Sequence, residues 1–254
     1  MKRIIFTFLF YNDYFILSRN FRRQYIGDHT WLFKNYNLSK ICYGLDELMI
    51  LNISNSPDYD KKFLKIIEQI SQTCFLPLTV GGKINSLNDA DEYFKVGADK
   101  IFVNDLIFKN SNICNELAKT YGSQAVMGGI NISFIKNNYF VFKSDGLTKY
   151  NKNFNYHLNY LLDINIGEVL IQSIDNDGTG VGLDLSILDL IPNNFPLPII
   201  LMGGIGKKQH IIDGLSNRKV DAISTANILN FIGSSLLTVR HDAINAGINI
   251  PQLK

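Results

Sequence analysis

Glycine and amide residues follow short apolar runs at several places in this sequence. Gly81-Gly82 and Gly203-Gly204 each come directly after such a run, and Asn104 follows another. A further run, Glu168 to Ser173, leads into a polar, glycine-rich stretch at 174–182. Backbone N–H groups at glycine-rich strand ends and helix N-termini are unpaired donors that bind phosphate. The pattern therefore predicts several strand ends that point at one ligand.

The apolar runs are too short for helices, and they alternate with segments of helical periodicity. Parallel strands joined by helices need right-handed crossovers, and eight such units close into a barrel whose active face is built from the loops after the strands. We therefore predict an α/β fold, a single (βα)8 TIM-barrel domain over residues 1–254. The predicted strands are 3–10, 47–53, 76–80, 100–104, 125–131, 168–173, 198–202 and 221–226.

The clearest predicted helix has apolar residues at helical spacing from Phe63 to Ile70. Another is expected to begin after Ser86 as its N-cap, with Asp89 three residues on, and to end at Gly97. The remaining helices are predicted at about 30–36, 112–120, 156–164, 208–215 and 234–246, with one more after Asp184.

Two segments differ from the alternating pattern. Ser18 to Asp28 is polar, carries Arg19, Arg22 and Arg23, and is predicted as a long loop that either closes over an anionic substrate or is simply solvated. Two β-favouring runs within 132–146 flank Asn137-Asn138, which indicates a hairpin inserted after the fifth strand.

The composition indicates an ordinary folded protein, with 46% hydrophobic residues and 19% charged residues. A net charge of +2 gives no electrostatic case for nucleic-acid binding. The apolar start, Met1 to Phe10, is predicted as a strand rather than a signal peptide, and no run is long enough to span a membrane. We expect a cytoplasmic chain with no bound metal and no cofactor, because the four histidines are scattered.

The three cysteines, Cys42, Cys74 and Cys114, fall inside apolar segments without metal-like spacing. Buried, reduced thiols are the expected state.

An internal repeat supports the barrel. Gly81-Gly82 and Gly203-Gly204 are 122 residues apart, and Leu9 and Asn131 have the same separation. Asn104 and Asn227 are 123 apart. The first four strands thus map onto the last four, which is typical of a barrel made from two similar halves.

Motifs along nearly the whole chain resemble the cyclase subunit of imidazole glycerol phosphate synthase. They are Arg3-Ile4-Ile5, Asp46-Glu47-Leu48, Pro77-Leu78-Thr79-Val80-Gly81-Gly82, Gly97-Ala98-Asp99-Lys100, Gly122-Ser123-Gln124-Ala125-Val126, Gly167-Glu168-Val169-Leu170 and Ser173-Ile174-Asp175-Asn176-Asp177-Gly178-Thr179. The resemblance implies a half-barrel-duplicated fold that forms a heterodimer with a glutaminase subunit. It also implies ring closure with the glutaminase's ammonia, on a substrate with a phosphate at each end.

The chain resembles one branch of this family more closely than the others. Tyr25-Ile26-Gly27-Asp28, and the lack of an acid in the first strand, are similar to a paralogous branch linked to surface-polysaccharide genes. Its members are thought to help amidate a sugar. The resemblance therefore implies sugar amidation in preference to histidine-pathway ring closure.

The family's general acid and base are aspartates at the ends of strands one and five. Leu9 and Asn131 stand at these positions, and neither side chain can transfer a proton near neutral pH. Asn131 and Asp177 are the candidate catalytic residues, and Asp175 and Asp184 are further candidates for a substitute acid. A histidine-pathway cyclase with substitute groups, and a non-catalytic barrel that activates the glutaminase, both remain alternatives.

The resemblance also assigns phosphate-binding positions. The second-half site falls on Asp177, Gly178, Gly204, Ala226 and Asn227, and it looks intact. The first-half site departs from the family, since Lys83 replaces a glycine and Asp105 follows Asn104 where a hydroxyl residue is usual. We expect Lys83 to pair with Asp105 or to bind an anion itself, and we expect the substrate to have a single anionic end.

Arg3, Glu47, Lys100 and Glu168 match the family's four charged residues that admit ammonia at the bottom of the barrel. Asp99 would lie beside them on the face that docks the glutaminase. The alternative reading is a purely structural ring of ion pairs, and both roles are compatible.

Overall fold

Eight parallel strands form a closed barrel in the computed structural model, which describes residues 1–35, 42, 44–144, 146–226 and 235–251. The sheet closes because β12 pairs with β1, with Ala222 beside Arg3. The predicted (βα)8 TIM barrel is confirmed. In spatial order the strands are β1 (Arg3–Tyr11), β4 (Glu47–Asn52), β5 (Leu78–Gly81), β6 (Lys100–Val103), β7 (Val126–Ile135), β10 (Glu168–Ser173), β11 (Ile199–Met202) and β12 (Ala222–Thr225).

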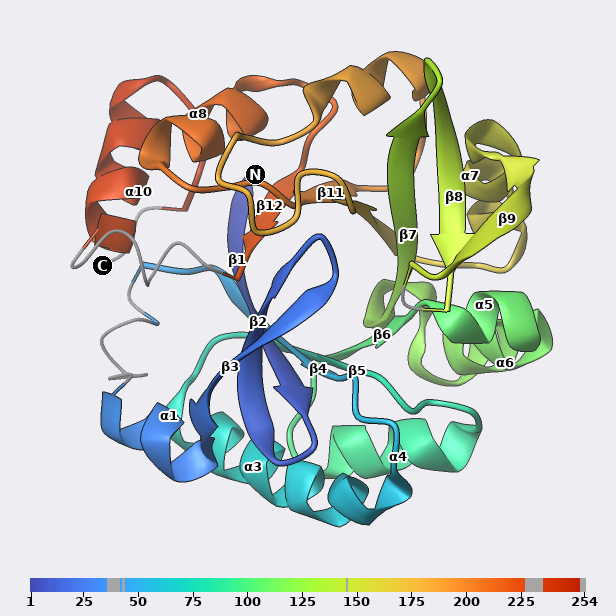
Figure 1. Cartoon of the computed structure of the whole chain (residues 1–254), viewed down its shortest axis with the longest axis vertical. Coiled ribbons are helices and arrows are strands. Elements are labelled where there is room, and N and C mark those ends of the chain that lie inside the picture. Colours follow the sequence, from blue (N-terminus) through green and yellow to red (C-terminus); the bar gives the residue numbers. More distant parts are fainter. Residues whose placement is uncertain (36–41, 43, 145, 227–234, 252–254) are drawn as a thin grey trace.

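Helices cover the outside of the barrel (Figure 1). Ser86 caps α4 as predicted, because its side chain accepts a hydrogen bond from the Asp89 amide. The segment after Asp184 forms only a 3-10 helix, and the short helix α5 was not predicted. The α-helices are α1 (His29–Asn35), α3 (Asp60–Thr73), α4 (Leu87–Lys95), α5 (Asp105–Lys109), α6 (Ser111–Tyr121), α7 (Phe154–Asp163), α8 (Lys208–Ser216) and α10 (Ser235–Asn245), and the 3-10 helices are η1 (Pro57–Tyr59), η2 (Ser123–Ala125) and η3 (Leu185–Leu190).

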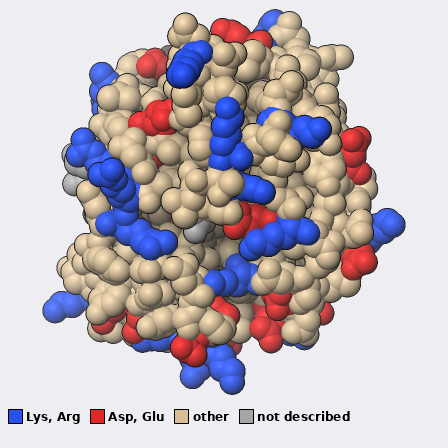
Figure 2. All heavy atoms as spheres, turned by 45° about the vertical axis from the view of Figure 1, so that its right-hand side comes forward, with Lys and Arg blue, Asp and Glu red and all other residues tan. Residues whose placement is uncertain are grey.

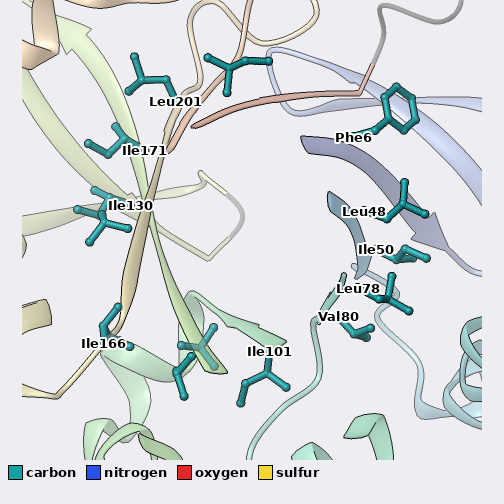
Figure 3. Packing of buried hydrophobic residues seen from close by; sticks show 14 of the residues in the cluster. Phe6, Leu48, Ile50, Leu78, Val80, Ile101, Ile130, Ile166, Ile171 and Leu201 are labelled. Atoms are coloured by element: carbon teal, nitrogen blue, oxygen red, sulfur yellow. The ribbon is translucent and has the colours of Figure 1, made fainter. Parts of the chain in front are cut away.

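Side chains alternate between the two faces of the strands and make two separate apolar clusters. Outward-facing residues such as Phe6, Leu48 and Val80 pack beneath the helices, and Figure 3 shows them in an arc around the barrel wall. Inward-facing residues such as Ile5 and Met127 fill the barrel interior. The interior is thus a packed core that leaves its two ends for polar groups.

The first strand of each half continues into an antiparallel extension. The predicted hairpin after the fifth strand is present, since β7 turns into β8 (Asn138–Lys143), and β9 (Thr148–Asn153) adds a strand that was not predicted. The prediction of a loop at Ser18 to Asp28 was wrong, because β2 (Tyr14–Arg19) and β3 (Arg22–Asp28) form a hairpin on β1. β3 is largely exposed, so its sequence has no alternation of apolar and polar residues to indicate a strand.

The two halves correspond in detail. Leu9 on β1 lies opposite Leu51 on β4, and Asn131 on β7 lies opposite Gln172 on β10. Each half also carries its hairpin on its first strand, β2–β3 on β1 and β8–β9 on β7. Figure 1 shows the β2–β3 hairpin lying across the centre of the barrel.

The prediction of three reduced cysteines was wrong for two of them. Cys42 and Cys74 form a disulfide with 6.5 Å between their Cα atoms, while Cys114 is a buried free thiol. The two bonded residues are 32 positions apart, and only the folding of Cys42 against the end of α3 brings them together. No helix within the described ranges is long and apolar enough to cross a membrane.

Candidate active site

Four charged side chains form a closed ring at the N-terminal end of the barrel strands. Arg3 contacts Glu47 at 3.0 Å and Glu168 at 3.2 Å. Lys100 contacts the same two carboxylates, at 3.3 Å and 3.0 Å. The structure therefore brings together all four residues that the family resemblance placed at the bottom of the barrel, with positive and negative charges alternating.

Burial and hydrogen bonding hold this ring in place. Glu47 is 2% exposed, and its Oε1 accepts a 2.6 Å hydrogen bond from Thr79 inside the barrel. Burial lowers the pKa of Arg3, but Glu168 and Glu47 raise it, and the net pKa is above the ordinary value. Because each charge has two opposite neighbours, the ring tolerates removal from water.

Asp99 lies directly before Lys100, on the exposed surface of the barrel floor. Its Oδ2 accepts a 2.8 Å hydrogen bond from the Leu78 amide at the start of β5. Part of the carboxylate thus has a structural partner within the chain, and the rest faces outward.

Leu9 and Asn131 line a cavity of about 410 Å³ at the opposite, C-terminal end of the strands. They are 8% and 6% exposed, and Gln172 lines the cavity beside Asn131. None of these side chains ionises near neutral pH. The ends of β1 and β7 therefore offer packing and hydrogen bonds to a ligand but no placed acid or base.

Three cations of the described part of the chain line the same cavity, namely Arg23 on β3, Lys83 after β5 and Lys109 at the end of α5. The Arg23 guanidinium lies 4.0 Å from the centre of the Tyr11 ring, which positions it at the mouth. Lys83 has a φ of 60°, a conformation that is uncommon for any residue but glycine. Figure 2 shows Lys and Arg side chains around a hollow, with an acidic group between them. The charges favour an anionic ligand.

Asp105 and Asn104 also line the cavity. The Asp105 carboxylate accepts a 2.9 Å hydrogen bond from the Ser144 amide in the β8–β9 turn, and it lies 3.8 Å from Lys109. Among the described residues it makes no ion pair with Lys83, so the first alternative predicted for Lys83 is not observed. Asp105 instead fastens the second hairpin over the first-half site.

The three carboxylates of the β10 loop all hold a hairpin or a turn. Asp175 accepts hydrogen bonds from Ser133 and the Phe134 amide, and Asp184 accepts one from Tyr139 at 2.7 Å. Asp177 accepts hydrogen bonds from Ser18 at 2.6 Å and from the Phe21 amide at 3.1 Å. Each candidate for a substitute acid therefore already has a structural task.

Burial raises the pKa of Asp177, although the hydrogen bonds from Ser18, Phe21 and Gln172 lower it. A raised pKa is typical of a carboxyl that serves as a general acid, but it also follows simply from burial.

The described part of the second-half site is closely packed. A Cβ at Gly178 would lie 2.1 Å from the Ser18 carbonyl oxygen, and one at Gly204 would lie 2.0 Å from the Gly182 carbonyl oxygen. Both glycines also have positive φ. The glycines are thus required by the chain's own packing. Ala226 directly follows β12, and Asn227 falls outside the described residues.

Sequence reasoning missed the residues where the two hairpins meet. A Cβ at Gly146 in the β8–β9 turn would lie 2.7 Å from the ring of Phe21 in the β2–β3 turn. Asn20 beside it donates a 2.7 Å hydrogen bond to the Asp175 carbonyl. No local signal indicates these contacts, because they join segments more than a hundred residues apart.

Comparison with known proteins identifies the family. A family model described as "Histidine biosynthesis protein" matches residues 19–233. The chain is 36% identical over 242 residues to a protein of Parasynechococcus marenigrum named "Putative imidazole glycerol phosphate synthase subunit hisF2", covering 95% of this chain and 90% of the relative. The chain belongs to the HisF family.

Two further HisF relatives agree. The HisF subunit of imidazole glycerol phosphate synthase from Exiguobacterium is 33% identical over 216 residues, covering 85% of this chain and 82% of the relative. That of Chloroherpeton thalassium is 38% identical over 186 residues, covering 73% and 74%. This chain is therefore a HisF-like cyclase subunit, and HisF membership accounts for the barrel with its two similar halves.

Proposed function

We propose that this HisF-family chain receives ammonia from a separate glutaminase through the Arg3–Glu47–Lys100–Glu168 ring. It uses the ammonia at the cavity mouth to amidate a surface-polysaccharide sugar, rather than to close the imidazole ring of the histidine pathway. The observation that carries the proposal is the combination of an intact charged ring at one end of the barrel with Leu9 and Asn131 at the other.

The N-terminal end of the barrel, which the charged ring closes, is the proposed entry for ammonia, a small neutral molecule. The ring closes the end of a barrel whose interior is packed with Ile5, Met49, Met127 and their neighbours. Ammonia could pass if one contact of Lys100 or Arg3 opened, and the remaining opposite charges would keep the other members paired. Asp99, exposed beside the ring, is the proposed docking residue for the glutaminase.

The residues at the C-terminal end of the barrel strands argue against ring closure. A positioned acid or base contributes roughly 10²–10⁴-fold to a proton-transfer reaction. The aliphatic Leu9 and the amide Asn131 cannot supply it, and Asp177 is buried against the first hairpin. Asn131 lines the cavity and is the proposed hydrogen-bonding contact to the reacting atoms, whereas Asp177 would reach them only if its bonds to the first hairpin opened.

The proposed anion-binding positions lie in both halves. Lys83 and Asn104 line the cavity in the first half. Asp177, Gly178, Gly204 and Ala226 are the described second-half positions, which Asn227 would complete, and none of these four lines that cavity. Lys83 supplies a full positive charge, whereas the second-half glycines are packed by the chain itself. A substrate with a single anionic end fits this asymmetry better than one with a phosphate at each end.

Turnover of the bisphosphorylated histidine-pathway intermediate with ammonium chloride tests the proposal. We expect no ring closure above the uncatalysed rate. A Leu9→Asp/Asn131→Asp double variant serves as the matched control, because it supplies the two carboxylates on the same scaffold. Robust ring closure by the unmodified chain would overturn the proposal and would favour a histidine-pathway cyclase in which Asp177, with its raised pKa, substitutes as the acid.

A second measurement separates a catalyst from a scaffold. Thermal shifts with a panel of phosphorylated and nucleotide-linked sugars should reveal at least one ligand that stabilises the chain, since a ligand bound only to the native state raises its apparent stability. If no sugar shifts the transition while a glutaminase is still activated by the chain, the barrel acts as a non-catalytic scaffold.

A further inference from the structure

Phe75 is the most exposed large apolar side chain among the described residues, at 94%. It lies in the four-residue segment between the end of α3 at Thr73 and the start of β5 at Leu78. An aromatic ring held in water loses the hydrophobic stabilisation that burial would give it. Isolated apolar residues are common on surfaces, so the position and rigidity of Phe75 decide whether it has a role.

The segment that carries Phe75 is fixed on both sides. Cys74 is bonded to Cys42 and its amide caps α3 through the Ile70 carbonyl. The Pro77 carbonyl accepts a 3.0 Å hydrogen bond from the Leu48 amide. Phe75 is therefore presented by a short, restrained segment, and little conformational entropy remains to be lost when a partner covers it.

Phe75 stands beside the charged ring. β5 lies between β4 and β6, whose first residues are Glu47 and Lys100. The Leu78 amide, three residues after Phe75, binds the exposed Asp99 carboxylate that immediately precedes Lys100. The exposed aromatic ring of Phe75 and the carboxylate of Asp99 thus lie on one side of the charged ring, at the N-terminal end of the barrel.

Further apolar surface lies at the same end. Met1, which precedes the ring residue Arg3, is 75% exposed. A groove of about 380 Å³ runs along the starts of β11 and β12, walled by Phe195, Pro196 and Pro198 with Arg218 at its side. Aromatic residues and Met are enriched in protein interfaces, so these exposed side chains favour a docking role for this end of the barrel.

We propose that Phe75 is the anchor of the surface that docks the glutaminase, and that it enters an apolar socket on that subunit, next to the docking residue Asp99. This inference rests on the proposed function, in which a glutaminase binds the end of the barrel where ammonia enters. Its position between the strands that carry Glu47 and Lys100 would seal the rim of the ammonia entrance against water. Energetically dominant interface residues are typically aromatic, and they are surrounded by contacts that exclude water.

The test measures affinity for the glutaminase subunits encoded in the source genome, by titration calorimetry with the full-length chain. Phe75→Ala should weaken binding at least tenfold. Leu147→Ala is the matched control, because Leu147 is 85% exposed but lies in the β8–β9 turn at the opposite end of the barrel, and it should leave the affinity within twofold. Circular dichroism checks that both variants fold.

The possible failures are distinguishable. If the unmodified chain binds a glutaminase and Phe75→Ala weakens binding less than tenfold, this inference is wrong while the proposed function stands. If the unmodified chain binds no glutaminase, both are wrong. If ultracentrifugation shows that the chain self-associates and that Phe75→Ala abolishes only that association, the face joins two copies of this chain and the inference is overturned.

Discussion

The Ser18 hydroxyl donates a 2.6 Å hydrogen bond to the buried carboxylate of Asp177, 159 residues further along the chain. The same carboxylate oxygen accepts a 3.1 Å hydrogen bond from the Phe21 amide. Ser18 belongs to the hairpin of the first half-barrel, and Asp177 to the β10 loop of the second. One carboxylate therefore ties the first hairpin across the mouth of the barrel.

Replacing Asp177 by Ala should release this hairpin while the barrel stays folded. The buried Ser18 hydroxyl and the half-buried Phe21 amide lose their acceptor, which costs up to about 1–3 kcal/mol each, so the Phe21 amide should exchange its proton at least tenfold faster. Hydrogen-exchange mass spectrometry of the 14–28 segment measures this. Ser133→Ala is the control, because Ser133 on β7 donates its hydrogen bond to Asp175 rather than to Asp177, the carboxylate that binds the first hairpin. If the Phe21 amide exchanges its proton at the same rate in Asp177→Ala as in the unmodified chain, the hydrogen bonds of Asp177 do not hold the hairpin.

Lys83→Met should weaken binding of inorganic pyrophosphate by about tenfold, because it removes a full charge from a partly enclosed cavity. Titration calorimetry at two salt concentrations gives the affinity, and the salt dependence should fall as well. Lys95→Met is the control, because Lys95 is exposed at the end of α4, away from the cavity. Equal affinities for the two variants would place the anion elsewhere.

Lys100→Met should destabilise the fold by about 3 kcal/mol, because it leaves Glu47 and Glu168 with Arg3 as their shared cation in the ring. Adding Glu47→Gln removes one charge of the opposite sign and should recover part of this loss. Urea unfolding of both single variants and the double variant gives the coupling energy. Strictly additive effects would mean that Lys100 and Glu47 do not act together.

The same Lys100→Met variant has a functional consequence under the proposed ammonia route. With the glutaminase and an accepted sugar substrate present, glutamine-supported turnover should fall about tenfold, a change of roughly 1.4 kcal/mol in barrier. Turnover supported by added ammonium should stay within twofold, since the mouth is unchanged. An equal loss with both nitrogen sources would argue for a structural ring only.

The disulfide should be visible in solution. Cys42→Ser should lower the free energy of unfolding by about 3–4 kcal/mol under oxidising conditions, since the bond closes a loop of 32 residues in the unfolded chain. Dithiothreitol should produce the same loss in the unmodified chain and in Cys114→Ala, but not in Cys42→Ser. Thiol titration in denaturant should find one free thiol. Three free thiols in protein purified under oxidising conditions would contradict the bond.

His157 should make stability depend on pH. It is fully buried, stacked on Phe108 at 4.7 Å, and burial lowers its pKa to about 4. The unfolded chain takes up a proton near pH 6.5, so the stability is complete above that pH and falls as the pH drops toward 4, by up to about 3 kcal/mol. His157→Phe should remove this contribution and keep the stacking.

The measurement for His157 compares the variant with the unmodified chain at pH 8 and pH 5 by urea unfolding. The difference between the two proteins should shift by about 2 kcal/mol in favour of His157→Phe at pH 5. Other carboxyls and histidines titrate equally in both proteins and cancel. A difference that is the same at both pH values would mean that His157 takes up a proton as readily in the folded state as in the unfolded state.

Much of the framework could be predicted, because it depends on local patterns. The eight apolar runs, the Ser86 cap and the glycines after β5 and β11 are signals carried by neighbouring residues. The ring of Arg3, Glu47, Lys100 and Glu168 was predicted from the resemblance to the cyclase subunit, and barrel geometry explains why four strand starts meet at one end. The β2–β3 hairpin was not, because an exposed strand shows no apolar alternation.

The sequence alone therefore determined the barrel, its two similar halves, the charged floor and the absence of ionisable groups at the positions of Leu9 and Asn131. Only the tertiary structure decided that Asp105 and Asp177 hold the hairpins, that Lys83 faces a cavity without pairing with Asp105, and that Cys42 meets Cys74. The physical reason is the sequence separation between the residues that make contact. Strands and helices follow from periodicities of two and 3.6 residues, whereas these contacts join single residues from distant segments, and their partners are fixed only when the whole barrel closes.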